Sequence, residues 1–229
     1  KVKEGAEKEQ ELLERELLME NHLKEARLKY LQSQINPHFL FNSLNAGAQL
    51  AMMEDAEKTC IFLDKMAEFF RYNVKKGLED ATVGDETAAA ENYIYILNVR
   101  FAGDIQFKES IDQRVLDVKM PSMILQPIVE NSIKYGFGED RDCLEIRIST
   151  RIQNEVLSVI ISDDGVGIST ELLEKLKANL DQGQNQTDHI GIYNVHKRIR
   201  LVYGSGYGVG IDSEMEKGTV VTLRVPCEE

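Results

Sequence analysis

A histidine occurs inside a helical pattern in the segment QINPHFLFNSLN. Each residue of an α-helix turns by about 100°. Asn42 and Asn45 therefore share a face with His38, whereas the apolar Leu40 and Leu44 point nearly opposite. This arrangement makes His38 a candidate nucleophile, although a surface histidine without chemistry gives the same pattern.

Pro37 directly precedes this histidine. Proline has no N–H, so it cannot donate to the carbonyl of Ser33 four residues earlier, and its ring crowds that turn. We therefore expect the helix to be kinked or loosened at Pro37, which makes this residue a candidate hinge beside His38.

The segment QPIVENSIKYG carries a second set of polar residues on a predicted helix. Glu130, Asn131 and Lys134 lie together on one face, while Ile128 and Ile133 face a sheet. The set combines a base, a neutral oxygen ligand and a cation, and an amide oxygen suits Mg²⁺ with its waters and phosphates. The alternative is a structural i,i+4 ion pair between Glu130 and Lys134.

A third segment, SDDGVGI, follows a strand-like apolar run. Asp163 at the strand end could accept a hydrogen bond from an exocyclic amine. Gly165 and Gly167 would let the backbone approach a flat ligand closely. The alternative is a tight turn stabilised by an Asx side chain, and the spacing of an EF-hand calcium loop is absent.

Two shorter motifs come later in the chain. Gly191 opens a predicted helix whose N-terminal amides could bind phosphates. Gly218 and Thr219 stand at the start of the last predicted strand. Each of these motifs is weak evidence when taken alone.

A long polar helix is predicted at the start of the chain, before the histidine segment. Residues 1–34 are rich in Glu, Lys, Leu and Arg, and the step from Leu17 to Leu28 fits an 11-residue repeat better than a heptad. An imperfect two-stranded coiled coil is the interpretation, with a single solvated helix as the alternative. The helix is expected to continue through Pro37 to about Met53.

A second helix is predicted at 56–76 after a break at Glu54 and Asp55. Two helices joined by a short turn cannot bury both of their apolar stripes alone. Two copies of the chain would bury them in a four-helix bundle.

The rest of the chain alternates between helical and strand patterns. The predicted helices are 86–100 with Asp85 as N-cap, 121–136, 171–180 and 192–203, and the predicted strands are 105–109, 115–119, 143–151, 156–162, 208–213 and 219–225. This order indicates a two-layer α/β sandwich with three helices on one mixed, mostly antiparallel sheet.

Composition excludes several functions. The 229 residues are 42% hydrophobic and 29% charged, which is typical of a globular protein, and the net charge of −12 argues against nucleic acid as a partner. No apolar run of 18 residues and no signal peptide occur. Cys60, Cys143 and Cys227 lack metal spacing and are interpreted as buried thiols in a reducing compartment. Because the chain starts inside a charged helical pattern without methionine, we expect it to be a fragment.

The order and spacing of the four later motifs resemble the N, G1, G2 and GT boxes of the GHKL (Bergerat-fold) superfamily of ATPases and histidine kinases. Together with QINPHFLFNSLN, they resemble the LytS-type sensor histidine kinases over roughly residues 31–226. The resemblance implies an α+β protein. Its parts would be a coiled coil at 1–34, a dimeric hairpin with the phosphotransfer histidine at 35–80, and an ATP-binding sandwich of the Bergerat fold at 81–229.

The resemblance also implies residue roles. His38 would be the phosphoacceptor, Glu130 the general base, and Asn131 the Mg²⁺ ligand. The remaining ATP-binding residues would be Lys134, Tyr135, Asp163, Gly165, Gly167, Gly191, Asn194 and Thr219. Two positions depart from the usual boxes, since His189 replaces the first glycine of GxGLxN and Asp164 stands where asparagine is usual.

By this resemblance the chain would be the cytoplasmic portion of a homodimeric membrane sensor that uses Mg·ATP to phosphorylate itself. It would then pass the phosphoryl group to an aspartate of a response regulator receiver domain. Two alternatives are a nucleotide-binding signalling scaffold without turnover and a chaperone-type or mismatch-repair-type ATPase.

Overall fold

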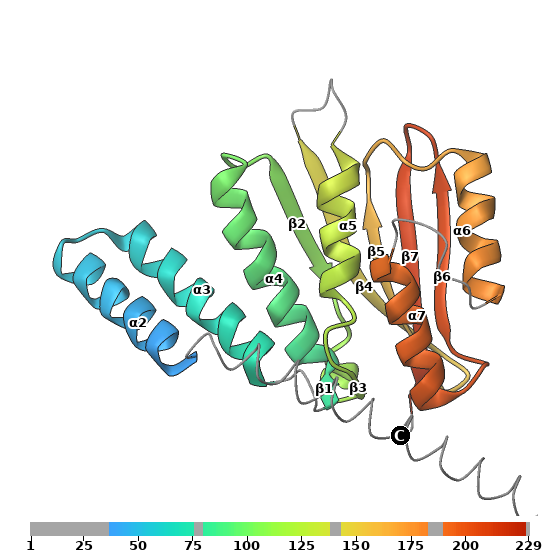
Figure 1. The fold of residues 1–229 in the computed structure, drawn as a ribbon, viewed down its shortest axis with the longest axis horizontal. Coiled ribbons are helices and arrows are strands. Elements are labelled where there is room, and N and C mark those ends of the chain that lie inside the picture. Colours follow the sequence, from blue (N-terminus) through green and yellow to red (C-terminus); the bar gives the residue numbers. More distant parts are fainter. Residues whose placement is uncertain (1–36, 76–79, 138–142, 183–189, 228–229) are drawn as a thin grey trace, which may run out of the picture.

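A computed structural model describes residues 37–75, 80–137, 143–182 and 190–227. A two-helix hairpin lies beside a sandwich of one sheet and one helical layer (Figure 1). The predicted coiled coil at 1–34 lies outside the described residues, as does the part of the predicted long helix that precedes Pro37. None of the described helices is long and apolar enough to cross a membrane.

The hairpin consists of α2 (Pro37–Met53) and α3 (Glu57–Lys75). The predicted break is confirmed, because Asp55 adopts a positive φ of 55° and the chain reverses there. The Ala56 N–H donates to the carbonyl of Ala51 at 2.8 Å, which closes the turn. Only small side chains and one thiol are fully buried between the two described helices, namely Ala48, Ala51 and Cys60.

The sheet has the strand order β2-β4-β5-β7-β6. Its strands are β2 (Ile105–Ser110), β4 (Leu144–Gln153), β5 (Val156–Asp163), β6 (Gly208–Glu214) and β7 (Gly218–Pro226). β2 pairs with β4 in parallel, and the other pairs are antiparallel. The prediction of a mixed, mostly antiparallel sheet is confirmed.

The register brings the apolar residues of neighbouring strands onto one face. Ile148 pairs with Ile161, and Ile161 pairs with Val221. All three are buried, as is Ile211, which pairs with Val221 from the edge strand. Side chains alternate across a strand, so the opposite face carries the intervening, more exposed residues.

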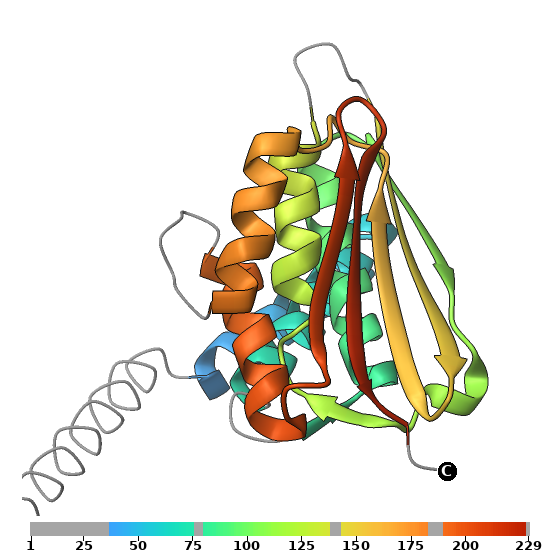
Figure 2. The same ribbon diagram turned by 90° about the vertical axis from the view of Figure 1, so that its right-hand side faces the viewer.

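Helices cover only this apolar face (Figure 2). They are α4 (Val83–Arg100), α5 (Gln126–Gly136), α6 (Thr170–Gln182) and α7 (Ile190–Tyr203). The described layer therefore contains four helices instead of the predicted three, because α4 also packs against β2 and α5. Ile128, Val129 and Ile199 are among its fully buried residues.

The start of α4 differs from the prediction. Thr82, not Asp85, is the N-cap, and its hydroxyl accepts a hydrogen bond from the Asp85 N–H at 3.1 Å. The Asp85 carboxylate accepts in return from the Thr82 N–H at 3.1 Å. Asp85 is thus the third helical residue of a reciprocal capping box, which moves the helix start back to Val83.

The segment before α5 was also predicted wrongly. The strand expected at 115–119 is a 3₁₀ turn, η1 (Gln113–Val115), followed by β3 (Lys119–Pro121). β3 pairs with β1 (Asp80–Thr82), and Pro121 lies in that pair opposite Asp80. Pro121 therefore does not open a helix, and α5 begins five residues later at Gln126.

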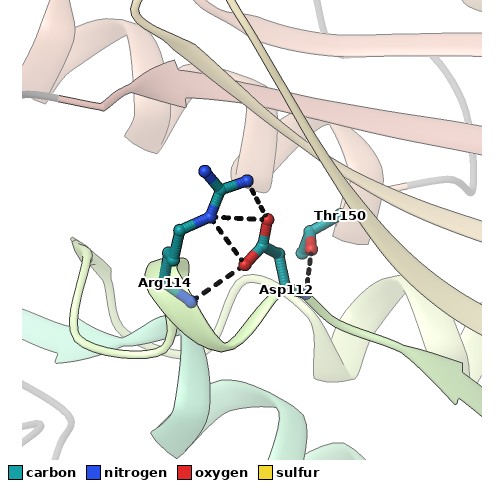
Figure 3. Close-up of polar contacts among 3 residues, drawn as sticks. All are labelled: Asp112, Arg114 and Thr150. Atoms are coloured by element: carbon teal, nitrogen blue, oxygen red, sulfur yellow. Dashed lines mark hydrogen bonds and ion pairs between the residues drawn. The ribbon is translucent and has the colours of Figure 1, made fainter.

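A polar cluster fixes the turn after β2 (Figure 3). The Asp112 N–H donates to the Thr150 hydroxyl at 2.9 Å, and the Asp112 carboxylate accepts from the Arg114 backbone N–H at 3.0 Å. The Arg114 guanidinium donates to the same carboxylate at 2.6 Å. These hydrogen bonds from Arg114 lower the pKa of Asp112 to about 2. The cluster joins the turn to β4.

The prediction of three buried thiols is partly wrong. Cys60 and Cys227 are buried, whereas Cys143 is exposed. Cys143 directly precedes β4, at a strand end where the chain emerges from the sandwich. All three cysteines are free.

Candidate functional site

The site is organised around Asp163, the last residue of β5. Its Oδ1 accepts hydrogen bonds from the N–H groups of Gly165 at 3.1 Å and Thr219 at 3.2 Å. Its Oδ2 accepts from the Ser132 hydroxyl of α5 at 2.7 Å. One carboxylate thus joins the glycine loop, the last strand and the motif helix, so three of the four predicted segments meet here.

Burial raises the pKa of Asp163 above its ordinary value, against the effect of the three hydrogen bonds, which lower it. Desolvation disfavours the charged form of a carboxyl group. A desolvated acceptor that is fixed on one side by protein donors is suited to a ligand that brings its own N–H. A carboxylate in this setting can accept a hydrogen bond from the amine of a ligand, which is the role that the sequence predicts for Asp163.

The glycines of the loop allow close approach of the backbone. A Cβ on Gly165 would lie 2.6 Å from the Cα of Gly136 at the end of α5, so no larger residue fits there. Gly167 has a φ of +71°, and a Cβ on it would lie 2.1 Å from the carbonyl oxygen of Glu214. The loop is thus pressed between α5 and the β6–β7 turn, and only glycine satisfies both positions.

Ser213 completes the support of this loop and was not found from the sequence. Its hydroxyl accepts from the Ile168 N–H at 2.9 Å, donates to the Gly218 carbonyl at 2.8 Å and lies 3.0 Å from the Thr219 hydroxyl. A serine on an edge strand gives no sequence signal of this role. The pairing of Ser213 with Thr219 across β6 and β7 creates it.

A second part of the site lies where α5 meets α7. The Asn131 side-chain nitrogen is buried and has no hydrogen-bond partner among the described residues. A Cβ built on Gly191 would lie 3.6 Å from this nitrogen, so the start of α7 is directly beside it. Because an amide can turn over to exchange its oxygen and nitrogen, Asn131 can present an oxygen ligand here. A buried polar atom without a partner fits a site completed by a bound group.

The other predicted residues surround this junction. Glu130, Lys134, Tyr135 and Asn194 are exposed on α5 and α7. The Lys134 ammonium lies 4.8 Å from the centre of the Tyr135 ring, which directs this cation along the last turn of α5. The exposed carboxylate and cation remain accessible to a ligand from solvent.

Glu130 faces α4. Burial is the main reason why the pKa of Tyr93 on α4 is raised, and the negative charge of Glu130 adds to it. The Tyr93 ring stacks on Phe69 of α3 with centroids 5.6 Å apart. The candidate base therefore lies on the side of α5 toward which the hairpin is docked.

His38 lies in the first turn of α2, directly after Pro37. Asn42 and Asn45 are exposed, whereas Leu40 and Leu44 are half-buried, as the helical spacing predicted. His189 lies outside the described residues.

Comparison with known protein families identifies two adjacent matches. Residues 26–105 match a family described as histidine kinase. Residues 117–229 match the family described as histidine kinase-, DNA gyrase B-, and HSP90-like ATPase. The two matches follow each other in the order of the hairpin and the sandwich.

Curated relatives have consistent names. The chain is 30% identical over 217 residues to sensor histidine kinase YesM of Bacillus subtilis, covering 95% of this chain and 36% of YesM. It is 32% identical over 207 residues to sensor histidine kinase BtsS of Escherichia coli, covering 90% and 34%. It is 34% identical over 212 residues to sensor protein LytS of Oceanobacillus iheyensis, covering 91% and 36%. The chain spans about a third of the length of these relatives.

The two family models together match most of the chain, a histidine kinase region followed by an ATPase domain of the histidine kinase, DNA gyrase B and HSP90 type. The chain belongs to the histidine kinases, and the curated relatives that it matches are named as sensor proteins. The resemblance inferred from the motifs is confirmed.

Proposed function

We propose that this chain is the catalytic portion of a membrane-anchored sensor histidine kinase of a two-component system. It transfers the γ-phosphoryl group of Mg·ATP to His38 and then to an aspartate of a response regulator receiver domain. The observation that carries the proposal is the junction of α5 and α7. There the Asn131 side-chain nitrogen, which has no hydrogen-bond partner among the described residues, lies beside Gly191 on the same sandwich as Asp163.

The two halves of the site have separate tasks. Asp163 accepts a hydrogen bond from the adenine amine, with Gly165, Gly167 and Thr219 shaping the pocket around it. Lys134 and Tyr135 lie near the ribose and phosphates, and the first turn of α7 supplies backbone donors for the phosphates. Gly191 and Asn194 belong to that turn.

A divalent cation fits the same junction. Asn131 offers one amide oxygen, and Mg²⁺ in such sites takes most of its other ligands from water and phosphate. When bound, Mg²⁺ would neutralise charge on the transferring phosphoryl group.

The phosphoryl transfer uses a nitrogen of His38 as nucleophile. The nitrogen forms a bond to the γ-phosphorus, and the bond from that phosphorus to the oxygen shared with the β-phosphate breaks, which releases ADP. Glu130 accepts a hydrogen bond from the other ring N–H and stabilises the developing positive charge on the imidazole. The N–P bond is reactive enough to pass the group to an aspartate carboxylate.

The apolar surface of the hairpin supports the proposal of a homodimer. Large apolar side chains are exposed along its described residues, and they are Phe39, Leu50, Met52, Met53, Ile61 and Val74. Met53 is 81% exposed and Phe39 72%, which is costly for side chains of this size. A second copy of the hairpin would bury them in a four-helix bundle, with 35–80 as the dimerisation unit, 1–34 as the coiled coil and 81–229 as the catalytic domain.

The test is incubation with γ-labelled Mg·ATP, followed by addition of a candidate receiver domain. Label that is stable in base, lost in acid and passed to the receiver supports the proposal. ATP hydrolysis without protein labelling would favour the chaperone-type ATPase, and ATP binding without either would favour a scaffold.

A further inference from the structure

A buried carboxylate that the proposed chemistry does not use lies between the hairpin and α5. Glu86 is in the first turn of α4 and is 2% exposed. Its Oε1 accepts from the Met123 N–H at 2.5 Å, and its Oε2 accepts from the N–H groups of Ile124 and Leu125 at 2.8 Å each. A buried charge requires such donors.

These three amides are the entrance to α5. Leu125 is the N-cap of α5 and makes no side-chain capping bond. Met123 has a positive φ of 57°, which turns successive N–H groups toward one point and forms an anion-binding concavity. Glu86 therefore acts as a long-range cap that fixes the start of α5. Glu130 and Asn131 are on this helix, so Glu86 also sets their position.

A fourth donor to Glu86 comes from the hairpin. The hydroxyl of Tyr72, near the end of α3, donates to Glu86 Oε1. Burial and then the negative charge of Glu86 raise the pKa of Tyr72 far above its ordinary value. Tyr72 thus keeps its proton at any working pH and can donate to Glu86.

The neighbouring contacts dock the same two helices. The Asn92 side chain of α4 donates to Glu68 of α3 at 3.1 Å, and the rings of Phe69 and Tyr93 stack with an interplanar angle of 27°. Figure 1 shows the C-terminal end of α3 converging on α4, and the two helices are in contact. Among these contacts, the hydrogen bond of Tyr72 leads directly to the carboxylate that holds α5.

We infer that Tyr72 and Glu86 are positioning residues. They hold the α2–α3 hairpin, which carries His38, in a fixed position relative to α5, which carries Glu130 and Asn131. Neither residue is among those proposed to contact the nucleotide or the reacting atoms. Removing the Tyr72 hydroxyl leaves three amide donors on Glu86, so α5 stays capped. The hydrogen bond that links α3 to this carboxylate is lost. The effect should appear in phosphoryl transfer to His38 and not in nucleotide binding. This inference rests on the proposed function.

The primary test compares Tyr72→Phe with Tyr203→Phe. Tyr203 is a matched control, because its half-buried side chain donates to the Lys119 carbonyl at 3.1 Å, away from the hairpin. Both variants should bind ATP within about twofold of wild type by calorimetry. At saturating Mg·ATP, Tyr72→Phe should autophosphorylate at least about fivefold more slowly, and Tyr203→Phe should match wild type.

A double-variant cycle with Glu86→Ala tests the pairing, because alanine offers the Tyr72 hydroxyl no acceptor. In that background, Tyr72→Phe should change the rate by less than about twofold. If Glu86→Ala does not fold, hydrogen exchange on the single Tyr72→Phe variant replaces the cycle. Exchange should then accelerate at the end of α3 and stay unchanged at Ile124 and Leu125.

Several outcomes would overturn the inference. One is a Tyr72→Phe rate equal to or above wild type, and another is a loss of ATP affinity that accounts for the slower rate. A wild-type protein that takes no label would instead contradict the proposed function. In that case, unchanged exchange at the end of α3 in Tyr72→Phe would contradict the positioning role independently.

Discussion

Replacing Asp163 with asparagine should separate nucleotide binding from folding. The Oδ1 position receives two backbone N–H groups, from Gly165 and Thr219, so the amide oxygen of the new side chain must occupy it. The amide NH₂ then takes the Oδ2 position, opposite the Ser132 hydroxyl at 2.7 Å. A serine hydroxyl can rotate to accept a hydrogen bond, so the protein side of the site stays satisfied.

Folding should therefore not suffer. Because burial raises the pKa of Asp163, its ionised form at neutral pH is disfavoured in the folded protein. The stabilisation from proton binding is complete below the unfolded pKa of about 4 and is lost as pH rises through the raised folded value. The neutral amide that replaces the carboxyl group has no charge to desolvate, so the unfolding midpoint at pH 7 should hold or rise in Asp163→Asn.

ATP affinity should fall, because two donors, the new NH₂ and the adenine amine, would face each other. A mispaired buried polar group costs about 1–3 kcal/mol. Since about 1.4 kcal/mol is a tenfold change in Kd, calorimetry should show a Kd raised roughly 5- to 150-fold. Asp212→Asn is the matched control, because Asp212 is exposed on β6 and pairs only with Lys177 among the described residues. An unchanged Kd in Asp163→Asn would refute the role of Asp163 as the amine acceptor.

Three further predictions concern chemistry, pH and the hinge. Glu130→Gln should keep ATP affinity but slow autophosphorylation by about 10²–10⁴, the usual loss for a general base; a near-normal rate would leave Glu130 as a structural residue. ATP affinity should weaken as pH falls through the pKa of Asp163, which burial raises above its ordinary value, and titration calorimetry should show Asp163→Asn lacking this phase. Pro37→Ala should leave ATP affinity unchanged and shift the His38 phosphorylation rate several-fold; equal rates at equal dimer content would exclude a hinge role.

The parts of the site that the sequence predicted are those whose signals are local. Asp163, Gly165 and Gly167 are neighbours on one strand and loop, so their spacing alone indicated a ligand turn. Asn131 was predicted from a single helix face. These local signals do not contain the long-range contacts of Asp163, which come from Ser132 and Thr219.

The parts that the sequence did not predict depend on partners far along the chain. Glu86 caps a helix that starts about 40 residues later, and no local pattern distinguishes it from an ordinary first-turn glutamate. Pro121 was taken as a helix start, as proline often is, but β1 supplies a strand partner for it at Asp80. Ser213 similarly acquires its role only when β6 pairs with β7. The roles of Glu86, Pro121 and Ser213 all depend on contacts with segments that are distant in the sequence.

The capping error had a different origin. Both Thr82 and Asp85 are good N-cap residues, and the two occur three positions apart. In a capping box both side chains are used, and the first of the pair marks the helix start. The presence of a threonine three residues before an acidic residue was the available signal.

Peptide mass spectrometry of the protein, after incubation with Mg·ATP under mildly basic conditions, would locate the phosphorylated residue. The phosphate is predicted on the peptide that contains His38, with none on that peptide in His38→Ala and ATP affinity equal in both proteins. Phosphate on another residue, or label persisting in His38→Ala, would contradict the assignment of His38 as the phosphoacceptor.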